Sequence, residues 1–216
     1  MRLETGRRMG MRVVETLAPG CVRAKIAGSV RRGKRECKDI EIVYIAQMGL
    51  RVADLFGGTE EYSVADGLIE GLVEKGYWRR DEEVKRWGSK YKRVVLEDIG
   101  YWGLRNWELG IGERVVVELF RAVQENWGLV LALRTGPAEF NHLLVNRFGG
   151  AMPADMCMRD GSLWRMGRRV ETPTEEVFFG ELGVPCWGPG ERSAARLGRW
   201  LWERRGRTRG QGDAVV

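Results

Sequence analysis

Histidine is nearly absent from this chain, and cysteine is sparse. Of 216 residues, one is His and four are Cys. The cysteines (Cys21, Cys37, Cys157 and Cys186) form no C-x-x-C pair, which indicates neither a zinc site nor a disulfide framework. We therefore expect reduced thiols in a cytoplasmic protein. The single imidazole, His142, is expected on a helix surface or in packing rather than in catalysis.

Long apolar runs are also missing. Residues 1–12, MRLETGRRMGMR, contain no apolar segment typical of a secretory signal, and no run of about 18 apolar residues occurs. Neither secretion nor membrane insertion is indicated. Hydrophobic residues make up 44% of the chain, enough to bury a core in one domain or two small ones. The net charge of +6 is consistent with a polyanionic partner without establishing one.

The most informative segment is residues 28–41, GSVRRGKRECKDIE. Apolar residues alternate with Asp39 and Glu41 at its end, which predicts a strand. Side chains two apart on a strand share a face, so these carboxylates are expected roughly 6.6 Å apart along it. Two acids there repel each other unless a cation lies between them. Magnesium suits that position because it takes carboxylate oxygens and keeps positions for phosphate oxygens.

The first half of the same segment combines a small-residue turn with cations. Glycine at 28 allows the backbone to approach a phosphate closely, and N–H groups in such a turn can form an anion nest. Arg31, Arg32 and Lys34 can add charge-assisted hydrogen bonds. Three plainer interpretations compete: a solvated acidic strand face, an exposed basic turn, and a P-loop. The P-loop is disfavoured because Arg35 occupies the position where Ser or Thr must bind magnesium.

The string GSVRRGKRECKDIE resembles the nucleotide-binding signature of the DNA polymerase X family, the polymerase-beta type of nucleotidyltransferase. That signature has Gly-Ser, a double Arg followed by Gly, and Asp-x-Asp at this spacing. Further segments resemble, in the family's order, a palm strand with a third carboxylate, a Thr-Gly segment with its helix, and the closing hairpin and helix of the thumb. They are residues 114–120, 133–141, 161–164, 171–176 and 182–185.

This resemblance implies an α+β fold. A nucleotidyltransferase (polymerase-beta-like) palm at 1–135 would have a mixed sheet with helices on one face, and a small α/β thumb would follow at 136–190. Residues 191–216, with seven Arg against three acids, would form a basic amphipathic helix and tail. Two roles stay open for that helix: binding nucleic acid through counterion release, or packing its Trp side on the thumb.

The resemblance also assigns site residues. Asp39, Glu41 and Glu118 would be catalytic and would hold two Mg²⁺ ions, with Mn²⁺ as an alternative. The residues implied to contact phosphates, sugar or base of the nucleotide are Gly28, Ser29, Arg32, Lys38, Thr135, Gly136 and Asn141. One ion would lower the pKa of a 3′-hydroxyl, and the other would neutralise the triphosphate and the leaving pyrophosphate.

Two positions depart from the family's pattern, which usually has Asp where Glu41 and Glu118 stand. An extra methylene moves a carboxylate by about 1.5 Å, and a misplacement of about 1 Å can cost roughly 100-fold in rate. Three outcomes stay open: a slower site, a preference for a larger ion such as manganese, or a protein that binds without catalysing.

We therefore expect a metal-dependent nucleotidyltransferase that adds nucleotides from an NTP or dNTP to a nucleic-acid 3′-hydroxyl. It would be a minimal, repair-type DNA polymerase without the lyase and fingers domains that usually precede the palm. The alternatives are a template-independent or RNA-directed terminal nucleotidyltransferase, and a catalytically impaired nucleic-acid-binding homologue. The expected partners are a nucleoside triphosphate and a DNA primer or primer-template, or RNA. No membrane is expected, and we expect a monomer.

Local signals predict several further elements. These are a helix at 3–17, a helix at 63–75 with Ser63 as its N-cap, a strand at 90–96, a hairpin excursion at 98–113, a two-residue hairpin turn at Asp160-Gly161, and a helix with Thr172 as N-cap that ends at Gly183.

Overall fold

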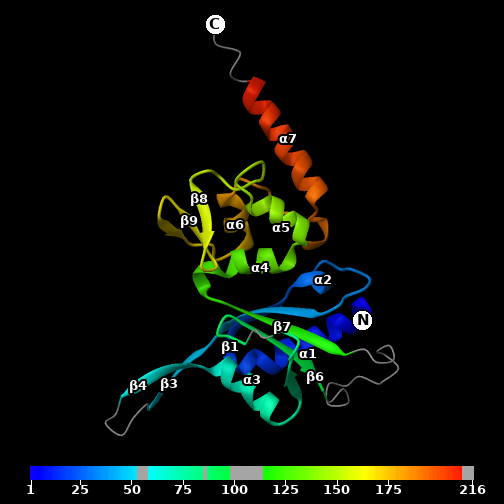
Figure 1. Ribbon diagram of the computed structural model, residues 1–216, viewed down its shortest axis with the longest axis vertical. Helices are drawn as coiled ribbons and strands as arrows, with labels where there is room; N and C mark the ends of the chain where they lie inside the picture. The colour runs from blue at the N-terminus through cyan, green and yellow to red at the C-terminus, as the bar shows by residue number, and fades with distance from the viewer. Residues whose placement is uncertain (53–57, 85–86, 98–113, 211–216) are drawn as a thin grey trace. The chain divides into compact units, whose positions relative to one another are not determined.

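The computed structural model describes residues 1–52, 58–84, 87–97 and 114–210, with side chains as far as 206. The chain divides into two compact units, Met1–Gln124 and Glu125–Val216. The α+β class is confirmed, since the described residues form helices together with a mixed five-stranded sheet and two small antiparallel sheets (Figure 1). The predicted hairpin excursion at 98–113 lies outside the described residues. Within the described part of the chain, no helix is long and apolar enough to cross a membrane.

The first unit is built around a mixed sheet with the strand order β1-β2-β7-β6-β5. Its elements are α1 (Leu3–Leu17), η1 (Ala18–Gly20), β1 (Cys21–Ile26), α2 (Gly28–Arg31), β2 (Ile40–Ala46), β3 (Met48–Val52), β4 (Thr59–Ser63), α3 (Val64–Glu74), β5 (Trp78–Arg80), β6 (Tyr91–Leu96) and β7 (Val115–Ala122). Strands β2 and β7 are parallel, and the other neighbours in the sheet are antiparallel. The separate β3–β4 ribbon extends away from the sheet (Figure 1).

One face of this sheet carries the core of the first unit. Alternate residues of β2, among them Ile40 and Ile42, are fully buried and pack with residues of α1 and α3 such as Met9 and Ile69. Both helices cover that face (Figure 1). Because side chains alternate along a strand, the intervening residues of β2 and β7 point to the opposite face, and Glu41 is among them.

The second unit has its own core. Its elements are η3 (Gln124–Asn126, which spans the boundary), α4 (Trp127–Thr135), α5 (Ala138–Val145), β8 (Met156–Arg159), β9 (Ser162–Arg165), β10 (Arg168–Val170), α6 (Glu175–Glu181), η4 (Pro189–Glu191) and α7 (Ala194–Gly210). Strands β8, β9 and β10 form an antiparallel sheet. Buried residues of α4, α5, α6 and α7 pack together, for example Leu129, Phe140, Phe178 and Leu197. The predicted palm boundary at 135 lies inside this unit, at the end of α4.

Two local predictions for this unit have different outcomes. The turn at Asp160-Gly161 is confirmed, since both residues have positive φ (53° and 76°) and join β8 to β9. The N-cap prediction at Thr172 is wrong: α6 begins after Thr174, whose hydroxyl accepts the Val177 N–H at 3.3 Å. The hydroxyl of Thr172 instead faces the carbonyl of Glu125 at 3.5 Å, and its N–H donates to the same carbonyl at 2.6 Å, so Thr172 is joined to the segment before α4.

Candidate active site

The glycine turn and the second carboxylate of the signature lie against each other. Gly28 has a φ of +62°, a conformation that L side chains rarely adopt. A Cβ added there would lie 2.6 Å from Oε2 of Glu41, so the carboxylate fills the space that a side chain would need. The pairing is fixed by the backbone, because the Ala27 N–H donates to the Glu41 carbonyl at 2.7 Å. Only glycine therefore fits at position 28.

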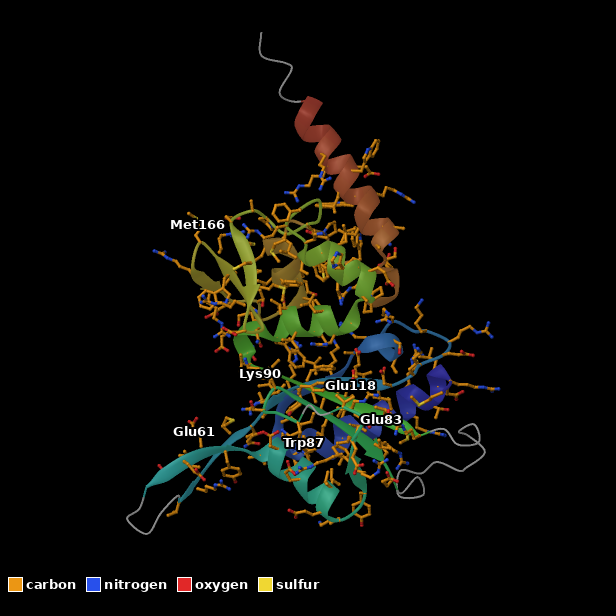
Figure 2. All side chains as sticks on the ribbon, viewed as in Figure 1. Glu61, Glu83, Trp87, Lys90, Glu118 and Met166 are labelled. Atoms are coloured by element: carbon orange, nitrogen blue, oxygen red, sulfur yellow. The ribbon has the colours of Figure 1, made fainter. Side chains whose placement is uncertain are left out.

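The third predicted carboxylate is the register partner of the second. Glu41 and Glu118 are opposite each other in the parallel pairing of β2 with β7, so their side chains leave the same face of the sheet on strands about 4.8 Å apart. Figure 2 shows Glu118 on β7. Oε2 of Glu41 is fully buried. The predicted proximity of these two residues, 77 positions apart in sequence (118 − 41), is present.

The first carboxylate, Asp39, lies one residue before β2. Burial raises the pKa of its carboxyl above the ordinary aspartate value, and the negative charge of Glu118 raises it further. Arg93 and Lys38 act in the opposite direction and lower it, as does a hydrogen bond from the backbone. Asp39 is therefore close enough to Glu118 for the two negative charges to interact.

Two residues that sequence reasoning missed hold Glu118. Its Oε1 accepts a hydrogen bond from the Tyr91 hydroxyl at 2.7 Å and lies 3.3 Å from Nη1 of Arg93. Arg93 also donates to Asp81 at 2.8 Å, and the Asp81 side chain is almost fully buried. Burial and the bond to Glu118 raise the pKa of Tyr91 to about 12, so this phenol keeps its proton. Tyr91 and Arg93 are two apart on the strand predicted at 90–96, so the sequence places them on one face of that strand but does not pair this face with Glu118.

The predicted phosphate-contacting residues of this unit lie around α2. The Oγ of Ser29 is buried and has no hydrogen-bond partner among the described residues. Buried hydroxyls in proteins usually have a partner, either in the protein or in ordered water, so this atom has capacity for a further hydrogen bond. Arg32 directly follows α2 and is partly buried. Lys38 is exposed beside Asp39.

Another cation of the signature, Lys34, lies elsewhere. It lines a cavity of about 950 Å³ at the start of α1, and the lining residues are Arg2, Leu3, Glu4, Lys34, Arg35 and Glu36. The N-terminus fixes this segment, because Leu3 N donates to the Arg35 carbonyl at 3.0 Å and Cys37 N donates to the Met1 carbonyl at 2.9 Å. The main chain around the basic loop is thereby held in place.

The remaining predicted nucleotide contacts belong to the second unit. Thr135 ends α4 and is fully buried. The Asn141 amide nitrogen donates to the carbonyls of Leu133 (2.5 Å) and Gly136 (3.2 Å), and a Cβ on Gly136 would lie 2.3 Å from Oδ1 of Asn141. The amide nitrogen of Asn141 is thus committed to the main chain around Gly136, whereas its Oδ1 is buried with no hydrogen-bond partner among the described residues. The contact of Thr135, Gly136 and Asn141 with a sugar or base stays a prediction. His142 is exposed on α5, as predicted for a helix-surface residue.

The donor set of the first unit matches a hard divalent cation, because magnesium and manganese bind carboxylate oxygens. Within the described ranges, no group of three or more His, Cys, Asp or Glu side chains is already arranged as a metal site. The contacts of Glu118 with Tyr91 and Arg93 are both made by its Oε1. The residues fit a cation in the chemistry of their donor atoms.

A scan of the chain against models of protein families gives no match, and a search of curated proteins gives none. The resemblance to the polymerase X family therefore stays a prediction from the sequence motifs.

Proposed function

We propose that this protein is a metal-dependent nucleotidyltransferase that transfers a nucleotide from an NTP or dNTP to the 3′-hydroxyl of a nucleic acid. The observation that supports it best is the packing of the Glu41 carboxylate on the Cα of Gly28, beside its register partner Glu118. A solvated acidic strand needs no glycine at positive φ under its carboxylate. A site that brings phosphate and cation together needs both.

The architecture of each unit supports the same proposal. The first unit would serve as a polymerase-beta-like palm, since α1 and α3 cover one face of its mixed sheet and the carboxylates project from the other. The second unit, with its small sheet and four helices among the described residues, would serve as the thumb. Fold alone does not establish activity, so the proposal depends on the site.

In the reaction, Asp39, Glu41 and Glu118 would hold Mg²⁺ or Mn²⁺. The cations would supply a lowered pKa at the attacking hydroxyl and charge neutralisation at the leaving pyrophosphate. Ser29 would donate its hydroxyl to a phosphate oxygen, and Gly28 would leave room for the Glu41 carboxylate beside it. The positive charges of Arg32 and Lys38 would stabilise the triphosphate. No histidine or serine nucleophile is required.

A second candidate is a nucleic-acid-binding protein with an impaired site. The observation that favours it is the engagement of Glu118 by both Arg93 and Tyr91. If this ion pair persists when nucleotide binds, the site would lack its third ligand. Glutamates at positions 41 and 118 lengthen the reach of two carboxylates and favour a larger ion, so manganese is the more informative cation to test.

The test is extension of labelled DNA and RNA primers, with and without template, in Mg²⁺ and in Mn²⁺. We expect extension that Asp39→Ala and Glu118→Gln each reduce at least about 100-fold. The matched control is Glu61→Gln, because Glu61 is exposed on the β3–β4 ribbon (Figure 2). Template dependence separates a polymerase from a terminal transferase. Primer binding without extension under any condition would overturn the proposed activity in favour of the second candidate.

A further inference from the structure

Helix α7 has two sides of different character. Leu197 and Leu201 are buried in the core of the second unit, whereas the Trp202 side chain is 77% exposed. The second half of the helix extends beyond the rest of its unit (Figure 1). Since α7 already buries its leucines, Trp202 is not needed for its packing.

Helical geometry places arginines next to this tryptophan. Arg199, Trp202 and Arg205 are three residues apart, so they lie along one face of α7, and all three are exposed. Over residues 196–209 the sequence has six Arg and a single acid, Glu203. The exposed face therefore combines an aromatic ring with strong positive charge.

Other arginines attach the helix to its own unit. Arg192 is buried and forms an ion pair with Glu175 at 2.8 Å. Arg204 donates to the carbonyl of Gly183 at 3.2 Å and lies over the Trp200 ring. The face that carries Trp202 is consequently presented on a fixed support, which lowers the entropic cost of binding a ligand.

We propose that Arg199, Trp202 and Arg205 form a docking surface for single-stranded nucleic acid. A strand with unpaired bases offers a π-face that can stack on Trp202, and its phosphates complement the two guanidinium groups. A duplex offers the phosphates but keeps its bases stacked internally. The proposal does not depend on the carboxylate site, because these three residues belong to the other unit.

A membrane surface is a poorer match to the same face. A helix that lies on a bilayer presents a continuous apolar side to the lipid. The leucines of α7 are instead buried in its own unit, and Trp202 is the one large apolar residue that α7 exposes strongly among its described side chains. Charge and a single aromatic ring favour a nucleic acid.

The test is the fluorescence anisotropy of a labelled oligothymidine of about 20 nucleotides, titrated with the full chain in EDTA without triphosphate. Trp202→Ala should weaken binding roughly ten-fold, and Trp202→Phe should retain most of the affinity. Arg199→Ala should lower the slope of log K against log salt by about 0.7. The binding of a blunt duplex should not respond to Trp202→Ala.

The controls are matched in exposure and charge. Phe148 is 90% exposed in the same unit but outside α7, and Arg168 is exposed on β10, so Phe148→Ala and Arg168→Ala should leave affinity and slope unchanged. Unchanged binding by Trp202→Ala, an equal loss in Phe148→Ala, or binding of anionic vesicles without oligonucleotide would overturn the proposal. Circular dichroism of each variant verifies folding. Because the assay lacks metal and triphosphate, its outcome is independent of whether primers are extended.

Discussion

Two carboxylates of the first unit, Asp66 and Glu118, each lie beside a tyrosine hydroxyl and a basic side chain. Asp66 lies in the first turn of α3 and is 2.8 Å from Nζ of Lys92, 3.5 Å from Arg121 and 3.4 Å from the hydroxyl of Tyr44. Lys92 is buried and also donates to the carbonyl of Gly88. One negative charge here faces two positive ones.

Glu118 also contacts a tyrosine hydroxyl and an arginine. Around Glu118, however, negative charges outnumber positive ones, whereas around Asp66 the positive charges are in excess. The arginine that contacts Glu118, Arg93, is shared with the buried Asp81. Asp39 and Glu41 add two further carboxylates on the same side. A carboxylate that faces an excess of positive charge stabilises a fold, whereas neighbouring like charges repel each other at a cost that a bound cation can relieve. The comparison thus separates a carboxylate with a structural environment from the one that we propose to be functional.

The largest effect is expected at Gly28. Gly28→Ala would force a Cβ into the Glu41 carboxylate, and we expect primer extension to fall about 100-fold as that carboxylate, a proposed metal ligand, moves. Gly33→Ala is the matched control, since its φ is +73° but its Cβ would meet only Arg7, at 3.8 Å. Both variants should lose about 1–2 kcal/mol of unfolding free energy to backbone strain. Equal extension rates in the two variants would contradict the role of the Gly28–Glu41 contact.

The next effect concerns stability. Asp66→Asn should lower the free energy of unfolding by about 2–3 kcal/mol, because the buried Lys92 loses its countercharge. Glu118→Gln should cost less than about 1 kcal/mol, since losing the Arg93 ion pair is offset by relief of the repulsion with Asp39. Urea denaturation of both variants measures the difference. A larger loss of unfolding free energy in Glu118→Gln than in Asp66→Asn would contradict the distinction between these two carboxylates.

A smaller effect depends on pH. The pKa of Asp39 is raised in the folded chain by burial and by Glu118. Because the pKa of Asp39 is raised, the folded state binds its proton more tightly than the unfolded state does. The resulting stabilisation is present below the pKa of the unfolded chain, about 4, and is lost as the pH rises through the pKa of the folded chain. Asp39→Asn should therefore melt at a higher temperature than the wild type at pH 7 and at the same temperature near pH 3. Thermal melts of both proteins between pH 3 and pH 7 measure this difference. An equal melting temperature at pH 7 would contradict the expected destabilisation by the Asp39 charge.

The smallest effect is expected from the two tyrosines. Tyr91→Phe frees Oε1 of Glu118 from one hydrogen bond and should tighten Mn²⁺ binding a few-fold. Tyr44→Phe removes the corresponding hydroxyl from Asp66 and should leave Mn²⁺ affinity unchanged. Calorimetric titration with Mn²⁺ compares them. A similar response in both variants would remove the distinction between the two carboxylates.

Features specified within a short stretch of sequence were predicted correctly. The helix at 3–17 is α1, and Ser63 caps α3 by accepting the Asp66 N–H at 3.2 Å. Each depends on neighbours a few residues away. The Thr172 error has the converse cause, because the hydroxyl and the N–H of the expected cap are both directed at Glu125, a residue distant in sequence.

The surroundings of the carboxylates could be predicted only in part. The motifs placed Glu41 with Glu118, but no local signal identified Arg93 as the partner of Glu118. That contact depends on the antiparallel register of β6 with β7, in which Arg93 is opposite Glu118. Register between strands far apart in sequence is set by the packing of whole faces, which a single sequence does not display.

The parallel pairing of β2 with β7 also has a consequence for the order of folding. The β1–β2 hairpin joins neighbouring segments, whereas β2 and β7 are far apart in sequence, so their pairing carries a larger loop-closure cost. We expect this pairing to be the later step, and it brings Glu41 and Glu118 together against charge repulsion. A divalent cation bound by both should accelerate the refolding of this chain, so the ion would assist assembly of the sheet before it takes part in any reaction.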